Sequence, residues 1–416
     1  MMKKSIFFAA AFAGVLCSCS QDEVNEGGGA VLDGRVPIQI GVSQPSVSVS
    51  RGIGTVGGTE ESGANVWQGQ QFKVSMFEKG TYQPAVDEED NQLFMNADFD
   101  APVGYDNDYA TASVQTGNKY YPTEGEFDFV GYYLDGAEQD AVPAPTEEGP
   151  YTVNVTIDGS QDIMTASAVP TEEDLLLPPY DGVDVTRLFS AYSARQGVVP
   201  VLNFQHKLVR LVFNAKPGNV NASSTAELGG DEYGVQIKSI SIESQNTGVL
   251  TVAQLDEKGH VVPGKLEFSG DSVPLSLKQR QAGDDLGTME LVDLTPAVLH
   301  WDSEAAEGEG AGILEQVGVA LLVQELKGEG EAYKMTIVLN QLMPGEQTPR
   351  EFTMTKDVRL PEGQSFKAGS SYNVNITVWG LEQISIKASL TAWEEGGNID
   401  LDPFNDPVTP AVEPEP

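Results

Sequence analysis

The sequence predicts an all-β fold made of β-sandwich domains, and three observations support this class. Several stretches alternate apolar and polar residues with a period of two, which is typical of strands with one buried face. Turns rich in Gly, Pro and Asp separate these stretches. The 44 glycines and 24 prolines among 416 residues disfavour long helices, so we expect a helical turn only in short segments such as Glu172–Leu177.

Five stretches show the alternation most clearly, and a shorter candidate strand, Pro37–Val42, precedes them. In each stretch we expect the apolar residues to face a core and the residues between them to face away from it. The rows of apolar residues are Phe72, Val74 and Met76; Tyr151, Val153, Val155 and Ile157; Met335, Ile337 and Leu339; Tyr372, Val374, Ile376 and Val378; and Ile384, Ile386, Ala388 and Leu390.

Val198–Phe213 is the most apolar stretch outside the N-terminus. Its apolar residues change phase near Leu208, so either a β-bulge lies there or both faces of the strand are buried. A strand covered on both sides suits a domain junction, and we place the boundary just before it, near Gly197. The predicted domains span residues 36–197 and 198–402. The Pro-rich residues 403–416 are expected to form a disordered tail.

The N-terminus has the pattern of a lipoprotein signal peptide. A basic start precedes an apolar run, Ser5–Leu16, that is too short to span a bilayer. Cys19 has a small residue directly before it and a leucine three positions before it, which predicts removal of residues 1–18 and lipidation of Cys19. The alternative is an ordinary signal peptide with incidental cysteines, although the chain's 2 cysteines both fall here.

The residues after Cys19 indicate where such a lipoprotein is sent. Ser20–Glu23 is similar to the acidic tag that directs some lipoproteins of anaerobic Gram-negative bacteria to the outer face of the outer membrane. The same residues also read as the start of a flexible acidic and Gly-rich tether, 19–35. Several acyl chains on Cys19 would anchor the protein firmly, because each buried CH₂ contributes about 0.8 kcal/mol.

The charge of the chain excludes several classes of partner. The formal net charge is −38, which repels phosphate backbones and anionic lipids, so nucleic acid is excluded as a partner. No second apolar run is long enough to span a membrane. Both cysteines precede the mature body, so disulfides, thiolate metal sites and cysteine nucleophiles are not expected there.

The motifs of enzymes and metal sites are missing from the sequence, so we expect no catalysis, no cofactor and no metal. Of the 3 histidines, His206 lies in an apolar stretch that suits a core histidine, His260 in a hairpin turn and His300 at a strand end. No nucleophile elbow, phosphate loop or zinc-protease motif occurs. The acidic clusters Asp87–Asp90 and Asp106–Asp108 lack EF-hand spacing and are expected to be solvated loops.

Two surface sites of modification are predicted. Arg51 precedes a Gly-rich loop and is one of few basic residues nearby, so a trypsin-like protease would cut after it, unless it is simply an exposed loop arginine. Ser272, within Asp271-Ser272-Val273, fits the acceptor that some of these bacteria O-glycosylate. A turn before Pro274 explains that tripeptide equally well.

Together these features resemble the fimbrillin family, the Mfa-like or type V pilins, which are surface lipoproteins of anaerobic Gram-negative bacteria. The resemblance lies in the order of short motifs along nearly the whole mature chain. These motifs are the lipobox with Ser20–Glu23; Pro37–Ile40 running to Arg51; Trp67 ahead of Phe72–Phe77; Lys119–Pro122 leading into Phe127–Tyr133; Gln161–Ala166; Phe204–Leu208; and Tyr372–Trp393.

The resemblance implies two tandem transthyretin-like β-sandwich domains and a subunit of a surface pilus, or fimbrium, that serves in cell adhesion. In this family an arginine-specific protease removes an N-terminal strand, and a strand from the next pilin subunit fills the groove by β-strand addition. Carried onto this chain, the removed strand is Pro37–Val42 and the cut follows Arg51. Arg35 is the alternative site, but cutting there leaves the strand in place.

One feature departs from the family pattern. Stalk pilins donate a C-terminal strand, but the last 14 residues here contain Pro403, Pro407, Pro410, Pro414 and Pro416, and proline cannot donate to a strand ladder. Either an earlier strand such as Ile384–Leu390 is released and donated, or this subunit donates none and takes a tip or accessory position. A host or bacterial surface ligand is a further expected partner.

Two other functions remain as alternatives. The first is a surface lipoprotein that never polymerises and binds glycans through exposed aromatic residues among Trp67, Trp301 and Tyr132-Tyr133. The second is a surface glycosidase, since 62 acidic residues leave room for a catalytic carboxylate pair.

Overall fold

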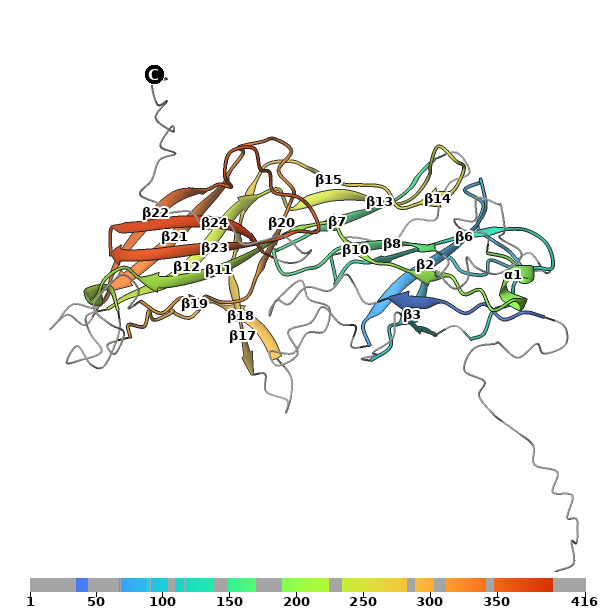
Figure 1. Cartoon of the computed structure of the whole chain (residues 1–416), viewed down its shortest axis with the longest axis horizontal. Helices are drawn as coiled ribbons and strands as arrows, with labels where there is room; N and C mark the ends of the chain where they lie inside the picture. Colours follow the sequence, from blue (N-terminus) through green and yellow to red (C-terminus); the bar gives the residue numbers. More distant parts are fainter. Residues whose placement is uncertain are drawn as a thin grey trace, which may run out of the picture.

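The structure is an elongated molecule with two lobes of β-structure (Figure 1). It is a computed structural model, and all structural statements below concern the residues that it describes. These residues are 35–43, 67, 69–87, 89, 91–103, 109–115, 117–137, 149–169, 189–223, 234–282, 289–302, 312–341 and 348–391.

The first lobe is built on one sheet with the strand order β4-β1-β9-β8-β6-β2-β3-β5. The strand β10 also pairs with β8. The core of the lobe is rich in aromatic side chains, including Trp67, Phe72 and Phe129, because the apolar residues of these strands face inward. The strands are β1 (Gly41–Ser43), β2 (Gln71–Glu78), β3 (Ala97–Asp100), β4 (Tyr109–Thr111), β5 (Ser113–Val114), β6 (Phe127–Tyr133), β8 (Met164–Val169), β9 (Val201–Leu202) and β10 (Gln205–His206).

The second lobe contains two sheets that share one aliphatic core. One has the order β19-β11-β23-β24 with β20 beside β11, and the other has the order β16-β12-β21-β22. Apolar rows such as Ile237 and Ile376 meet between them, the arrangement of a sandwich. The strands are β11 (Val209–Pro217), β12 (Val235–Ser244), β16 (Val273–Ser276), β19 (Glu315–Gln316), β20 (Leu321–Val323), β21 (Tyr333–Gln341), β22 (Arg350–Val358), β23 (Ser371–Gly380) and β24 (Gln383–Thr391).

Two smaller groups of strands complete the structure. A sheet with the order β14-β13-β15 also includes β7, which pairs with β13, and a separate hairpin is formed by β17 and β18. Figure 1 shows that β13 and β7 extend along the molecule toward the first lobe. These strands are β7 (Tyr151–Thr156), β13 (Thr247–Leu255), β14 (Val261–Val262), β15 (Leu266–Ser269), β17 (Lys278–Ala282) and β18 (Met289–Asp293).

Helical structure is short. The helix α1 (Ala191–Arg195) begins at Ser190, whose side chain accepts from the backbone N–H of Ser193, while the Ser193 hydroxyl bonds back to the Ser190 backbone. A 3₁₀ turn, η3 (Val220–Ala222), follows β11. The expected turn at Glu172–Leu177 lies outside the described residues. No helix among those described is long and apolar enough to cross a membrane.

The predicted all-β class is confirmed, and so is each of the five alternating rows. They form β2, β7, β21, β23 and β24, and their apolar residues with described side chains are buried or packed against a core. A period of two depends only on residues that are neighbours in the chain, so it can be read from the sequence whichever strand the segment pairs with in the fold.

Val198–Phe213 is the segment by which the chain passes from one lobe to the other. It contains three strands rather than one: β9 and β10 pair within the sheet of the first lobe, and β11 lies in the second lobe. Both phases are buried because the segment changes sheets at Lys207–Leu208. The division at Gly197 stays a prediction, since β9 and β10 follow Gly197 yet pair with the first lobe, and β7 precedes it yet pairs with β13.

Candidate functional site: the groove of the first strand

The segment 35–43 occupies an interior position in the first lobe. Its β1 portion pairs antiparallel with β4 on one side and parallel with β9 on the other. The residues before β1 form backbone hydrogen bonds along one flank, to Ala112, Lys119 and Tyr121, and pairing on the second flank begins at Gly41. The donor-to-acceptor pairs are Ile38 N to Lys119 O (2.8 Å), Tyr121 N to Val36 O (2.9 Å), Ala112 N to Ile40 O (2.9 Å) and Gly41 N to Pro200 O (2.9 Å).

Alternate side chains of the segment 35–43 point into the core. Val36, Ile38, Ile40 and Val42 are 4%, 8%, 1% and 0% exposed, whereas Gln39 between them is exposed. The sequence predicted a strand at Pro37–Val42, whereas the structure has β1 at Gly41–Ser43, preceded by an isolated bridge from Pro37 to Tyr120. A strand buried in this way contributes roughly 1.5–3 kcal/mol for each large aliphatic side chain.

Gly41 allows the segment to lie against its neighbours. A Cβ atom at this position would lie 2.7 Å from Cδ2 of Tyr109, a distance that ordinary contacts do not reach. The side chain of Val201 on the other flank lies almost as near, at 3.0 Å. The glycine is therefore explained by the close approach of both neighbouring strands rather than by an unusual backbone angle.

The four buried side chains of the segment belong to the same core as the large aromatic residues of the lobe. That core includes Leu202 and Phe204 of the crossing segment and Tyr121 of the loop that bonds to Val36. Removing the segment would leave an apolar groove with unpaired backbone groups along both sides. Such a groove is a site for β-strand addition, in which backbone pairing gives affinity and pockets for alternate side chains give specificity.

Trp67 closes one end of the groove. Its indole N–H donates to the carbonyl oxygen of Ser43 at 3.1 Å, and its ring contacts Phe72 and Phe204. The residue is fully buried, as is Tyr132 at 1% exposure. Of the aromatic residues named for the glycan-binding alternative, Trp67 and Tyr132 therefore fill cores and are not exposed.

Arg35 lies at the other end of the groove. It is exposed, and its guanidinium lies 4.5 Å from the ring centre of Tyr120. The peptide bond after it leads directly into buried Val36, whose carbonyl oxygen accepts from Tyr121. Arg51 and Cys19 lie outside the described residues.

β24 has the features expected of a strand that can be released. It is the last strand in its sheet order, and among the described residues it pairs with β23 alone, in an antiparallel register from Ser371–Thr391 to Gly380–Gln383. Ile384 and Ala388 are buried at 8% and 3% exposure. Its apolar residues have the same spacing as those of the segment 35–43.

The three histidines lie in separate places and each faces one acidic residue. Nδ1 of buried His206 lies 2.9 Å from Asp162, and Nδ1 of His260 lies 3.4 Å from Asp128. His300 faces Glu315 at the surface. Among the described residues, no group of three or more side chains is arranged to hold a metal ion. The core role expected for His206 and the hairpin position of His260 are both observed.

The remaining predicted residues lie apart from the groove. Ser272 is exposed in the turn between β15 and β16, where a modifying enzyme would reach it. Asp87 accepts backbone hydrogen bonds from Asn91 and Glu89, both at 2.9 Å, and these bonds, with Asn91 the stronger influence, lower the pKa of Asp87. These hydrogen bonds of Asp87 are made within its own loop. Asp106–Asp108 lies outside the described residues.

These features define a class of protein: an all-β chain whose first described strand lies in a groove between two others, and whose last described strand lies at a sheet edge. A sequence profile of the family described as fimbrillin-like, Mfa_like_1, matches residues 59–393. The chain therefore belongs to the fimbrillin-like family.

Solved structures similar to this chain come from Bacteroides and Porphyromonas species. A candidate cell adhesion protein from Bacteroides uniformis is 17% identical, with a TM-score of 0.43, over 87% of this chain and 98% of that one. A fimbrial protein from Bacteroides vulgatus is 13% identical, with a TM-score of 0.43, over 77% and 92%. The fimbrial anchor protein Mfa2 from Porphyromonas gingivalis is 12% identical, with a TM-score of 0.29, over 85% and 99%. Curated proteins gave no match to this chain.

Proposed function

We propose that this chain is a non-catalytic subunit of a bacterial surface pilus and that it polymerises by strand exchange. The observation that carries the proposal is the deep burial of alternate side chains in the segment 35–43, together with the pairing of its β1 portion to a strand on each side. Once that segment leaves, the groove has both open backbone edges and apolar pockets, and a strand of the same alternation from a neighbour satisfies both.

Lipidation and proteolytic cleavage set the order of steps in the proposed assembly. The chain is exported as a lipoprotein anchored through Cys19 at the outer membrane surface, and cutting after Arg51 separates the segment 35–43 from the body. Arg51 suits this role better than Arg35, because the Arg35–Val36 bond enters the paired segment directly. Cutting there would also leave the strand in its groove.

β24 is the donor strand in this proposal. Ile384, Ile386, Ala388 and Leu390 repeat the spacing of Val36, Ile38, Ile40 and Val42, so the same pockets receive them. β24 lies at the edge of its sheet and, among the described residues, is held by one ladder to β23, so its release separates it from a single neighbouring strand.

The first experiment compares the mature protein with its Arg51→Ala variant after treatment with trypsin. We expect the unaltered protein to lose residues up to Arg51 and to form a ladder of oligomers that resists detergent. The variant is expected to stay monomeric. Release of the N-terminal segment without any ladder or filament would contradict strand exchange.

The second experiment tests β24 as the donor. A disulfide between Asn375→Cys and Lys387→Cys, which are paired across β23 and β24, would hold β24 in place and abolish the ladder until a reductant is added. The matched control, Lys334→Cys with Asp357→Cys, locks β21 to β22 and should leave assembly unchanged. A ladder from the oxidised β23–β24 variant would exclude β24 as the donor.

A further inference from the structure

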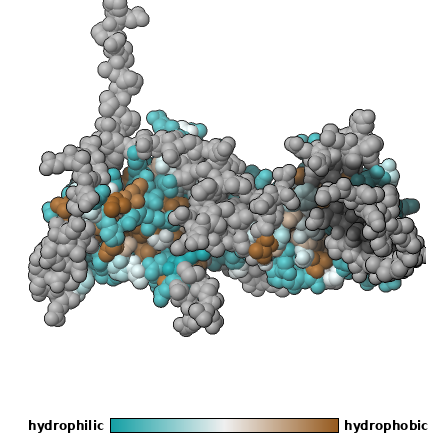
Figure 2. All heavy atoms as spheres, turned by 60° about the horizontal axis from the view of Figure 1, so that its bottom comes forward, coloured by the Kyte–Doolittle hydropathy of each residue, from teal (hydrophilic) through white to brown (hydrophobic). Residues whose placement is uncertain are grey.

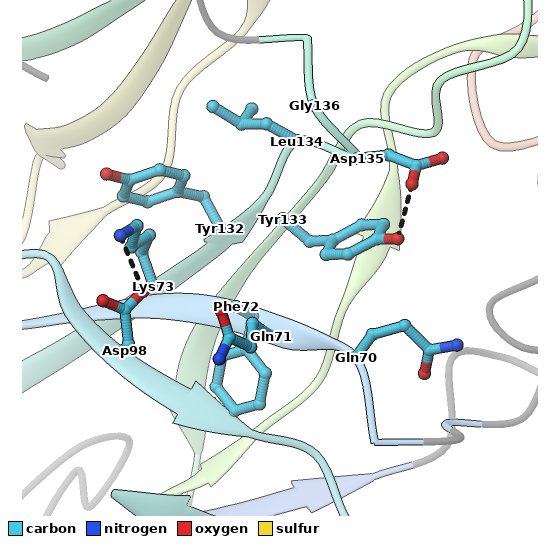
Figure 3. Close-up of a pocket in the computed structure, with 10 residues that line it drawn as sticks. All are labelled: Gln70, Gln71, Phe72, Lys73, Asp98, Tyr132, Tyr133, Leu134, Asp135 and Gly136. Carbon is cyan, nitrogen blue, oxygen red and sulfur yellow. Dashed lines mark hydrogen bonds and ion pairs between the residues drawn. The ribbon is translucent and has the colours of Figure 1, made fainter. Parts of the chain in front are cut away.

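A cavity of about 460 Å³ lies where β2 begins and β6 ends (Figure 3). The polar side chains that line it come from three strands and the turn after β6: Gln70, Gln71, Lys73, Asp98, Tyr133 and Asp135. None of its lining residues belongs to the segment 35–43.

Two polar pairs stand on opposite sides of this cavity. Lys73 and Asp98 form an ion pair with an N–O distance of 2.6 Å. On the other side the hydroxyl of Tyr133 donates to Oδ1 of Asp135 at 2.8 Å, and the amide of Gln71 lies between the two pairs (Figure 3). The lining therefore offers both hydrogen-bond donors and hydrogen-bond acceptors. The charges of Lys73 and Asp98 cancel each other.

The turn that carries Asp135 is held in an unusual conformation. Asp135 has a φ of 50° and Gly136 a φ of 81°, both in the left-handed region. Oδ2 of Asp135 accepts from the backbone N–H of Asp162 at 3.1 Å, which fixes the carboxyl group. Burial raises the pKa of Asp135 and of the Tyr133 hydroxyl. Strained backbone and shifted pKa values both concentrate at binding sites.

We propose that this cavity binds a neutral saccharide. A sugar hydroxyl both donates and accepts hydrogen bonds, which matches a lining of amide, phenol, ammonium and carboxylate groups. The volume falls in the range of small-molecule sites, roughly 300–1,000 Å³. An anionic ligand would find its only nearby ammonium, among the described lining residues, already paired with Asp98.

The test is saturation-transfer NMR on the uncut mature protein, with the methyl glycosides of glucose, galactose, mannose, fucose and N-acetylglucosamine as probes and sialyllactose as a charged comparison. We expect transfer to at least one neutral glycoside, with a dissociation constant of about 1 mM or tighter. Gln71→Ala should weaken that binding about three- to tenfold, the effect of one hydrogen bond.

Gln205→Ala is the matched control, because Gln205 is an exposed glutamine on β10 of the same lobe and does not line the cavity. It should bind as the unaltered protein does. Absence of transfer to every neutral glycoside, transfer to sialyllactose alone, or equal binding by Gln71→Ala would each overturn the inference. Because the uncut protein is used, a failure here is independent of polymerisation.

Discussion

At the residue scale, Asp162 lies deep in the protein beside two basic side chains. Both oxygens of its carboxylate lie close to Nδ1 of His206, at 3.0 and 2.9 Å. Burial lowers the pKa of Arg210 to about 10, and the nearby Asp162 carboxylate opposes that shift by favouring the charged guanidinium. All three side chains are buried where the chain passes between lobes.

Replacing Asp162 by asparagine should lower the free energy of unfolding by about 3 kcal/mol, because it removes the carboxylate charge that faces two buried basic groups. Denaturant titration of the uncut protein measures the change. Asp158→Asn is the control, since Asp158 is half-exposed in a surface pair with Lys278 and should cost less than about 1 kcal/mol. Equal effects of the two variants would contradict this account of Asp162.

Lys207 gives a prediction with a defined pH dependence. Burial lowers its pKa below 10.5, so the folded state binds the proton less tightly than the unfolded state does. Below the folded pKa the charged side chain therefore reduces stability, and stability recovers as the pH rises toward 10.5. We expect Lys207→Met to raise the free energy of unfolding at pH 7 by a few tenths to about 1 kcal/mol.

The stabilisation by Lys207→Met should shrink when the same denaturant titrations are made near pH 10.5, because the unaltered protein then carries a neutral Lys207. Lys258→Met, at an exposed position in the β13–β14 turn, serves as the control and should show a much smaller change with pH. A gain in stability that stays constant with pH would contradict desolvation as its cause.

At the element scale, the segment 35–43 should be a strong contributor to the stability of the uncut protein. Ile40→Ala is expected to lower the free energy of unfolding by about 2–5 kcal/mol, since the side chain is fully buried. Gln39→Ala, its exposed neighbour on the same strand, should change it by less than about 0.5 kcal/mol. If Ile40→Ala were as mild as Gln39→Ala, the segment would not be the stable occupant of its groove.

The strands were predictable from the sequence where the pattern is local. The rows in β2 and β23, and the buried alternation of Val36 to Val42, needed no knowledge of their partners. The pairing was not predictable, because it depends on residues far apart: β11 lies parallel to β23, more than 150 residues away. The change of phase near Leu208 indicated an irregularity in the strand. A β-bulge and a move from one sheet to another give the same sequence pattern, so the sequence could not distinguish them.

The parts of the site that the sequence did not predict are built from distant residues. Trp67 carries no alternating pattern around it, and its burial follows from Phe72 and Phe204. The cavity beside Tyr133 needs strand ends that meet only in the fold. For α1, Ser190 and Ser193 did carry a signal, but a serine in place of the usual Glu or Gln makes that capping pattern easy to miss.

At the scale of the whole molecule, the two lobes are joined by strand pairing and hydrogen bonds as well as by the connecting chain. Along the chain β7 lies between β6 and β8 of the first lobe, yet it pairs with β13. The β13–β14 turn reaches the first lobe, where Asp128 accepts from the backbone N–H of Val261 at 2.8 Å and the Tyr82 hydroxyl accepts from the N–H of Leu255 at 3.2 Å. Where Figure 2 shows residues in colour, hydrophilic residues lie beside separate apolar patches.

A fragment of residues 36–197 is therefore expected to lack a cooperative thermal transition in circular dichroism. It loses β9 and β10 from its sheet and leaves β7 without β13. Extending it to residue 207 restores β9 and β10 but not the partner of β7, so we expect only partial recovery. The uncut protein serves as the reference. Sharp, independent unfolding of the 36–197 fragment would show that the lobes are separable at Gly197.

The pairing of the segment 35–43 also has a mechanical consequence. Hydrogen bonds run to both flanks at Gly41–Val42 and to one flank along the residues before them, so a pull along the strand loads these bonds in shear instead of peeling them open one by one. A neighbour's strand in the same place would inherit this geometry. Each joint of the fibre would then resist tension through its slow rate of forced opening, which is what a cell held against flow requires.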